Sequence, residues 1–262
     1  MNRILFDKSE INCNICSFSD VRAEHVLNVL HGEVGQTLKT GELDGPVGTS
    51  EIVSISGNEV TVKCTHDAIS PAPWIDLVLA PPRPRAMKRL LPQLAAMGVG
   101  RIVLVGAEKV EKAFWGAQLL REEVHRPLLV DGLMQSGTST MPKIQVEKNF
   151  RRYAADRLDE DFAACTQRFV AHPCPQTQNH HSPRPRTGSH EPPATNRASL
   201  ACILAIGPEG GWTDEEVALL EERGFERYSL GPRILRTDTA AIALIAQLMQ
   251  RFDHVTTAGE EI

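Results

Sequence analysis

The apolar residues in the second part of the chain form short continuous runs that are typical of buried strands. Two such runs occupy 74–80 and 200–206, and the segments 101–105 and 168–171 are also predicted to be strands. A run of this length without alternation indicates a strand covered on both faces, as in a parallel sheet. Helix-length segments separate the strands, an order that implies right-handed crossover connections. The pattern therefore predicts an α/β domain with a parallel sheet.

Capping residues and the helical period predict the helices of this domain. Thr213, with Glu216 three residues later, makes a capping box at the start of one helix, and Gly224 suits the position after its end. Apolar residues at helical spacing over 87–95 predict another, which Pro92 is expected to kink or shorten. These helices connect consecutive strands of the predicted sheet.

The first 70 residues have the shorter period of a β-rich module. Apolar and polar residues alternate over 51–56 and again over 60–65, and Gly57 with Asn58 suits a two-residue hairpin turn. A helix is predicted over 22–30, where valines and leucines recur at helical spacing. Pro71 and Pro73 then mark a linker. We therefore expect two domains, one over 1–70 and one over 74–255.

Two glycine-containing turns follow strands near the end of the chain. The first, GPEGG at 207–211, follows the apolar run that ends at Ile206. The second, at 231–233, follows a short strand predicted over 227–230, and from Thr237 a helix begins that is apolar almost all round. The first turn has neither the GxGxxG spacing of dinucleotide sites nor the Gly-Lys-Ser/Thr of a P-loop. Spacing alone leaves two alternatives, a ligand-binding loop and a tight turn.

Composition narrows the class of protein. The chain has 262 residues and no apolar run of membrane-spanning length, and its N-terminus lacks the apolar region of a signal peptide, so we expect a cytoplasmic protein. Six cysteines then indicate reduced thiols. Cys13 and Cys16 form a CxxC pair, but the only further ligands on offer, Cys165, Cys174 and His172, have unorthodox spacing for zinc, and no metal is predicted.

Charge is distributed unevenly along the chain. The net charge is −5, and residues 1–70 hold five Lys or Arg against ten Asp or Glu. A basic run at Arg83, Arg85, Lys88 and Arg89 is either an RNA-binding patch or a solvated helix start. Residues 172–197 contain six prolines and four histidines but no Val, Ile, Leu, Phe or Met, so we expect a disordered surface insertion there.

The residues themselves resemble a known family. The chain carries IGPEGGW from Ile206, SLGPRILRTDTAA from Ser229 and QSG at Gln135 to Gly137, and these segments resemble the RsmE family of 16S rRNA uridine-N3 methyltransferases, of the SPOUT class. The resemblance implies a trefoil-knotted parallel-sheet methyltransferase domain and a PUA-like β-barrel at the N-terminus. The segment HVLNVLHGEVGQTL fits that barrel, although His31 and Gln36 stand where the family commonly has Arg and Asp.

The resemblance also implies a cofactor, S-adenosyl-L-methionine, and as partners 16S rRNA in the 30S subunit and a second copy of the chain in a homodimer. Arg236 is the expected catalytic cation, and the proton acceptor is Glu209, Asp238 or a water. RNA would contact the basic run at 83–89 and Arg233. The residues expected to bind the cofactor are Ala171, His172, Ile206, Gly207, Pro208, Glu209, Gly210, Gly211, Leu230, Gly231, Ile234, Leu235, Thr237 and Thr239.

The expected reaction is transfer of a methyl group to N3 of a uridine. This nitrogen must lose its proton to become nucleophilic, so the site needs a proton acceptor or a cation that stabilises the uridine anion. Two alternatives stay open at this point. One is an RNA-binding or ribosome-assembly factor without catalysis, and the other is a knotted methyltransferase for a different RNA position.

Overall fold

The structure is a computed structural model that describes residues 1–116, 118–173 and 201–251. The chain divides into two compact units, each of which combines segments distant in the sequence. The N-terminal unit comprises Met1–Pro73, Leu91–Gly98 and Arg121–Pro142, and the C-terminal unit comprises Trp74–Leu90, Val99–Leu120 and Lys143–Ile262. The domain division predicted at 70–74 stays a prediction. Of the predicted insertion at 172–197, all but His172 and Pro173 lie outside the described residues.

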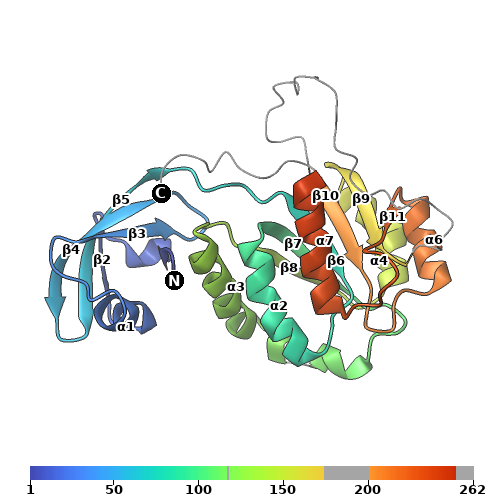
Figure 1. Ribbon diagram of the computed structural model, residues 1–262, viewed down its shortest axis with the longest axis horizontal. Helices are drawn as coiled ribbons and strands as arrows, with labels where there is room; N and C mark the ends of the chain where they lie inside the picture. The colour runs from blue at the N-terminus through green and yellow to red at the C-terminus, as the bar shows by residue number, and fades with distance from the viewer. Residues whose placement is uncertain (117, 174–200, 252–262) are drawn as a thin grey trace, which may run out of the picture. The chain divides into compact units, whose positions relative to one another are not determined.

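The N-terminal unit contains a mixed sheet of five strands in the order β1-β3-β4-β5-β2 (Figure 1). Its strands are β1 Ile4–Phe6, β2 Ile15–Phe18, β3 Thr37–Glu42, β4 Val47–Ser56 and β5 Glu59–Ala68. β1 pairs with β3 in parallel, and the other pairs are antiparallel. The predicted hairpin is confirmed, because Gly57 and Asn58 connect β4 to β5 and Gly57 has a φ of +60° that favours glycine.

Helices complete the N-terminal unit. They are the 3₁₀ helix η1 Lys8–Glu10, α1 Val21–Asn28, the end of α2 Pro84–Ala96, and α3 Glu122–Ser136. Asp20 caps α1 by accepting a hydrogen bond from the Arg22 N–H, and Val26 of α1 packs with Phe6, Phe18 and Ile52 in the core of this unit. The helix predicted over 22–30 is thus confirmed, with an end two residues earlier.

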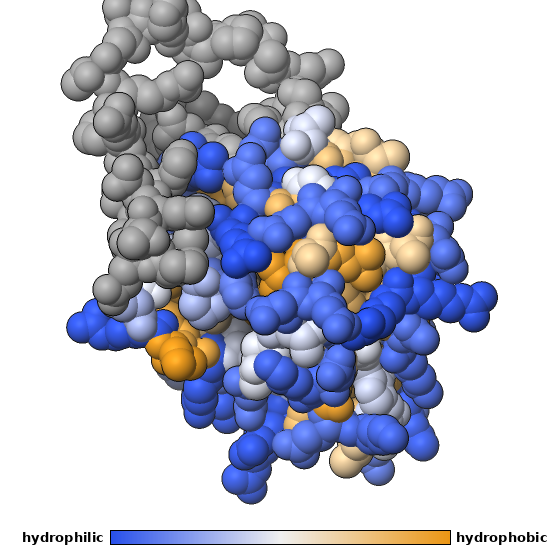
Figure 2. Space-filling model, turned by 90° about the vertical axis from the view of Figure 1, so that its right-hand side faces the viewer, coloured by the Kyte–Doolittle hydropathy of each residue, from blue (hydrophilic) through white to orange (hydrophobic). Residues whose placement is uncertain are grey.

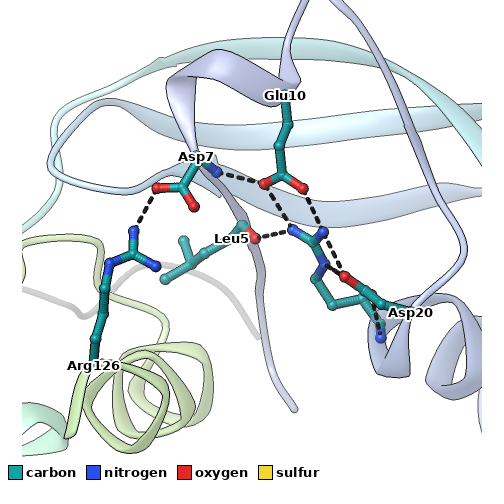
Figure 3. A network of polar contacts seen from close by, with 6 residues as sticks. Leu5, Asp7, Glu10, Asp20 and Arg126 are labelled. Atoms are coloured by element: carbon teal, nitrogen blue, oxygen red, sulfur yellow. Dashed lines mark hydrogen bonds and ion pairs between the residues drawn. The ribbon is translucent and has the colours of Figure 1, made fainter. Parts of the chain in front are cut away.

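The guanidinium of Arg22 links three residues near the start of the chain, Leu5, Glu10 and Asp20, which are labelled in Figure 3. The Arg22 side chain is only 13% exposed, and its guanidinium binds Glu10 at 2.5 Å, Asp20 at 2.7 Å and the Leu5 carbonyl at 2.9 Å. It also lies over the rings of Phe6 and Phe18. These contacts satisfy a charge that burial would otherwise make costly. Arg126 of α3 binds Asp7 in the same region, at 2.5 Å.

Pro92 does not shorten its helix, in contrast to one of the two predicted outcomes. It lies inside α2, which continues to Ala96. Its carbonyl oxygen faces α3 at Gly132, where an added Cβ would come within 2.1 Å of that oxygen. Only glycine permits so close an approach of two helix backbones. α3 also continues through Pro127, and it ends at Gly137, whose φ of +81° gives a left-handed cap at the QSG segment.

The C-terminal unit contains the predicted parallel sheet. Six strands, all paired in parallel, follow the order β11-β9-β10-β6-β7-β8. They are β6 Ile75–Leu79, β7 Val99–Val105, β8 Lys143–Glu147, β9 Cys165–Ala171, β10 Ala201–Ile206 and β11 Glu226–Tyr228. The strand predicted over 227–230 is wrong at its end: Ser229 already turns the chain, because its hydroxyl accepts a hydrogen bond from the Gly231 N–H at 3.2 Å.

Helices cover this sheet on both faces. They are the start of α2, the 3₁₀ helices η2 Lys112–Gly116 and η3 Gln118–Leu120, α4 Phe150–Asp156, α5 Leu158–Asp161, α6 Asp214–Glu222 and α7 Thr237–Arg251. Phe150 of α4 and Val217 of α6 pack with Ile203 and Ala205 of β10. α7 runs along β10, with Leu244, Ile245 and Leu248 buried (Figure 1). None of the described helices is long and apolar enough to cross a membrane.

Candidate active site at the carboxyl edge of the parallel sheet

The candidate site lies where the strands of the parallel sheet end. Because all six strands run in the same direction, the loops that follow them emerge at one edge. Ligands of open α/β sheets bind in this position, outside the carboxyl ends of the strands. The loops that begin at Ala80, Gly106, His172, Gly207 and Ser229 therefore share one edge, and they contain most of the residues predicted for the site.

The glycine loop, residues 207–213, leads from β10 to α6. Gly207 and Pro208 are buried, whereas Glu209, Gly210 and Gly211 are exposed. The Gly211 N–H donates to the Pro208 carbonyl at 2.8 Å, which closes a tight turn, and Gly211 has a φ of +70°. The loop ends in the predicted capping box, which is confirmed: Thr213 Oγ1 accepts from the Glu216 N–H at 3.2 Å, and Glu216 Oε2 accepts from the Thr213 N–H at 2.9 Å.

Gly207 lies against the indole of Trp212. A Cβ added at Gly207 would lie 3.0 Å from the Trp212 Cδ1 and backbone N atoms and 3.1 Å from Nε1. Trp212 is 3% exposed and stacks against Phe150 with ring centroids 4.9 Å apart. Its indole N–H is buried without a hydrogen-bond partner in the described part of the chain. A side chain at position 207 would therefore crowd the indole, and the loop leaves one buried donor unsatisfied within the described residues.

The second loop, residues 229–236, leads from β11 to α7. Gly231 has a φ of +105°, and residues 232–236 are exposed, Ile234 to 91%. The loop is tied to the first one at its end, where the buried hydroxyl of Thr237 donates to the Gly207 carbonyl at 3.2 Å. Thr239 is exposed and Leu230 is partly buried. The structure therefore brings the two predicted cofactor loops together.

Charged side chains surround the glycine loop. Arg83 Nε lies 3.3 Å from Glu209 Oε2, and its Nη2 lies 3.9 Å from Glu111. Lys109 Nζ donates to the Gly210 carbonyl at 3.0 Å. Two of these residues, Arg83 and Glu209, were predicted for RNA binding and catalysis respectively. Lys109 was missed, although its place just after a buried strand was a usable signal.

A second charged cluster joins α2 to α7. Asp238 Oδ2 lies 3.2 Å from Arg89 Nη2 and 3.3 Å from Arg236 Nη2. Asp238 Oδ1 accepts a hydrogen bond from the Thr239 N–H at 3.0 Å. The Asp238 side chain is 12% exposed, whereas those of Arg89 and Arg236 are 60% and 71% exposed. Sequence reasoning proposed each of these three residues for the site, but not that they meet.

Ala171 ends β9 on the same edge, and His172 follows it directly. The His172 N–H donates to the Tyr228 carbonyl at 3.3 Å, which continues the pairing of β9 with β11. Burial lowers the pKa of His172, so its imidazole is neutral at pH 7. A neutral ring in this position is a hydrogen-bonding group without a charge.

The remaining predicted RNA-binding residues lie on the surface. Arg85, Lys88 and Arg233 are exposed, and within the described residues their side chains form no hydrogen bond or ion pair. Figure 2 shows the face of the C-terminal unit near α6 and β11, where hydrophilic side chains predominate and frame small hydrophobic clusters. The basic run of α2 thus divides into paired arginines at the site and unpaired cations beside it.

The CxxC pair lies in the N-terminal unit. Cys13 is exposed with a φ of +48°, and Cys16 is buried. Burial raises the pKa of Cys16 to about 12, so this sulfur is a thiol at pH 7. Cys174 lies outside the described residues, and within them no group of three His, Cys, Asp or Glu side chains is placed to hold a metal ion.

Comparison with known proteins shows the class of protein to which the chain belongs. A family described as an RNA methyltransferase domain matches residues 70–249, the part of the chain that holds the parallel sheet and both loops. The fold agrees: a ribosomal RNA small subunit methyltransferase E from Neisseria gonorrhoeae, crystallised with S-adenosyl methionine, superposes with a TM-score of 0.68 at 23% identity, over 95% of this chain and 97% of that one. The chain therefore contains an RNA methyltransferase domain, and the expected SPOUT-class α/β fold is confirmed.

Curated relatives define the family. The ribosomal RNA small subunit methyltransferase E of Treponema pallidum is 30% identical over 255 residues, which cover 95% of this chain and 91% of that protein. A relative from Borreliella burgdorferi, ribosomal RNA small subunit methyltransferase E 1, is 24% identical over 93% of this chain and 95% of its own length. The chain belongs to the ribosomal RNA small subunit methyltransferase E family, which is the RsmE family that its motifs resemble.

Proposed function

We propose that the protein transfers a methyl group from S-adenosyl-L-methionine to N3 of one uridine in 16S rRNA of the small ribosomal subunit. The observation that carries the proposal is the meeting of the glycine loop, the second loop and Arg236 at one edge of the parallel sheet. The names of the relatives, with the cofactor bound in the Neisseria gonorrhoeae structure, support the substrate and the methyl donor.

The two loops fit a small ligand held by backbone groups. At Gly211 and Gly231 no other part of the described chain lies within 4 Å of an added Cβ, so a ligand has room to approach the main chain there. The indole N–H of Trp212, which has no partner among the described residues, belongs to the first loop. We therefore assign the ligand to the two loops and the end of β9, that is, to the residues predicted from the resemblance. The cofactor, when bound, would supply an electrophilic methyl group on a sulfonium sulfur.

The chain's own residues have to hold the uridine and manage its N3 proton. The methyl carbon gains a bond to N3 and loses its bond to sulfur, and the N3 proton leaves to an acceptor. Arg236 is exposed at the edge and is suited to stabilise the uridine anion. Glu209 and a water are the candidate acceptors that the geometry favours, since Glu209 is 39% exposed and has a single arginine within 3.3 Å.

RNA binding is assigned to the unpaired cations near the site. Arg85, Lys88 and Arg233 present charge to solvent. Arg89 shares helix α2 with Arg85 and Lys88, and Arg83 directly precedes this helix. Backbone phosphates are bound by such local patches even when the net charge of a protein is negative. The overall charge of −5 is therefore compatible with an RNA substrate.

A homodimer is part of the proposal. Three large apolar side chains are exposed at the start of α7 and in the loop before it, Ile234 at 91%, Leu235 at 37% and Ile242 at 38%. A second copy of the chain would cover them. Light scattering at micromolar concentration should give a dimer, and a clean monomer would contradict this part of the proposal.

The position of methylation is tested by primer extension. N3 lies on the edge of uracil that pairs with adenine, so a methyl group there stops reverse transcriptase. Treatment of unmodified 30S particles with the protein and S-adenosyl-L-methionine should create one new stop in 16S rRNA. No new stop, with cofactor binding intact, would contradict N3 methylation of 16S rRNA and would favour a binding factor without catalysis or a methyltransferase for a different RNA position.

A further inference from the structure

The carboxylate of Asp238, the acid in the second charged cluster, has polar contacts on both of its oxygen atoms. Asp238 Oδ2 accepts hydrogen bonds from two guanidinium groups, those of Arg89 at 3.2 Å and Arg236 at 3.3 Å. Its Oδ1 accepts one from the backbone N–H of Thr239. Its side chain is 12% exposed. A carboxylate removed from water in this way needs compensation, and here two cations supply it.

We propose that Asp238 is a positioning residue that holds Arg89 beside Arg236, and that Arg89 is thereby a second cation of the uridine site. This inference rests on the proposed function. It assigns the acceptor role to a group other than Asp238 and extends the site to α2, 149 residues away in the sequence.

The charges in the cluster explain why an acid is needed there. Two guanidinium groups that converge on one point repel each other, and the shared carboxylate turns this repulsion into attraction. The cluster of one acid and two arginines keeps a surplus positive charge. Because both arginines are more than half exposed, that charge faces solvent at the edge where the substrate binds. Exposed ion pairs contribute little to stability, so the arrangement is better explained by its effect on position.

A plain structural explanation of Asp238 accounts for only part of the geometry. An acid in the first turn of α7 interacts favourably with the helix dipole. That effect needs neither arginine, and it does not explain why an arginine from α2 contacts the same oxygen atom. The two explanations differ in what the loss of Asp238 does to Arg89 and Arg236.

Kinetics on unmodified 30S particles separates the explanations. In D238N the kcat should fall about 100-fold, the size expected when a substrate-facing cation is displaced, with the affinity for S-adenosyl-L-methionine unchanged by calorimetry. R89A alone should lower kcat about 10-fold, but it should add less than twofold in the D238N background, since Asp238 acts through the arginines. D238E should restore part of the loss. R152A is the matched control: Arg152 is an exposed arginine paired with Asp156 on α4, and its loss should leave kcat unchanged.

The double variant distinguishes positioning from proton transfer. If Asp238 accepted the proton itself, the losses in kcat caused by D238N and R89A would be independent and would multiply. A D238N kcat within threefold of the wild type, or full additivity with R89A, would each overturn the inference.

A second measurement does not depend on methyl transfer. The Nε–H signals of Arg89 and Arg236, assigned by R89K and R236K, should both shift in the nitrogen–proton spectrum of D238N and stay in place in R152A. If only one of them moves, the shared contact is wrong. An inactive wild type with this joint shift would instead count against the proposed function, with the pairing of the arginines upheld.

Discussion

Three residues, Gly207, Thr237 and Arg236, shape the candidate site at the edge of the parallel sheet. Gly207 makes room for Trp212, Thr237 ties the second loop to the Gly207 carbonyl, and Arg236 projects into solvent from the end of that loop. Each of these effects is local, and each can be removed by one substitution without a change in the fold.

Arg236→Ala removes the proposed stabiliser of the uridine anion. The expected loss in kcat is about 100- to 1000-fold, because a preorganised charge at a reacting group commonly has an effect of this size. The affinity for S-adenosyl-L-methionine, measured by calorimetry, should not change. A kcat within a fewfold of the wild type would contradict the assignment of Arg236 as the stabiliser of the uridine anion.

Gly207→Ala places a methyl group 3.0 Å from the indole of Trp212. Overpacking of this kind typically costs about 1–3 kcal/mol, so the free energy of unfolding should fall by that amount. The cofactor should also bind more weakly, since the loop has to move. Gly116→Ala is the control, because among residues 1–116, 118–173 and 201–251 nothing beyond its chain neighbours lies within 4 Å of an added Cβ there. Equal stability of the two variants would contradict the close contact at Gly207.

At the scale of the element, helix ends hold the loops in place. The capping box at the start of α6 fixes the end of the glycine loop, and Glu216 does more than cap: it is 1% exposed, and its Oε1 also accepts a hydrogen bond from the Glu108 N–H at 2.8 Å. α6 is therefore anchored to the loop after β7 as well as to its own first turn.

Thr213→Ala removes the capping oxygen. The loss expected for such a cap is about 1 kcal/mol, measured as the free energy of unfolding in urea. Thr213→Ser keeps the oxygen and should be close to the wild type. The capping role would be refuted by an alanine variant as stable as the serine variant.

The types of the elements could be predicted from the sequence, whereas the contacts of the site between residues distant in the sequence could not. The run at 200–206 and the capping box depend on residues next to each other in the chain, so both were predicted and are confirmed. Arg89 and Asp238 are separated by 149 residues, and Lys109 and Gly210 by 101. Such pairs depend on how elements pack, which periodicity does not specify. The end of β11 was missed because a side chain, that of Ser229, turns the chain there.

At the scale of the whole molecule, buried titratable groups link stability to pH. His66 in the N-terminal unit has a side chain only 3% exposed, with Nε2 2.8 Å from Thr40 Oγ1 and Nδ1 3.8 Å from Glu42. Burial lowers the pKa of His66 below its ordinary 6.5, against the opposing effect of Glu42. The folded state therefore takes up the proton at lower pH than the unfolded chain does.

The consequence is a loss of stability in weak acid. Below about pH 6.5 His66 binds a proton in the unfolded chain but stays neutral in the folded protein. The free energy of unfolding therefore falls as the pH drops through this range. Urea unfolding of the wild type at pH 7 and pH 5.5 should show the fall, and His66→Gln should show less of it. An identical pH dependence in both would contradict a buried neutral His66.

The central claim is that the edge of the parallel sheet methylates N3 of a uridine in 16S rRNA. The most direct measurement mixes the protein with methyl-labelled S-adenosyl-L-methionine and either unmodified 30S particles or naked 16S rRNA, then identifies the labelled nucleoside by mass spectrometry. The account predicts label in 3-methyluridine and in no other nucleoside, and the comparison of the two substrates shows which form of the RNA is used. Label in a ribose-methylated nucleoside, or none at all with the cofactor bound, would contradict it.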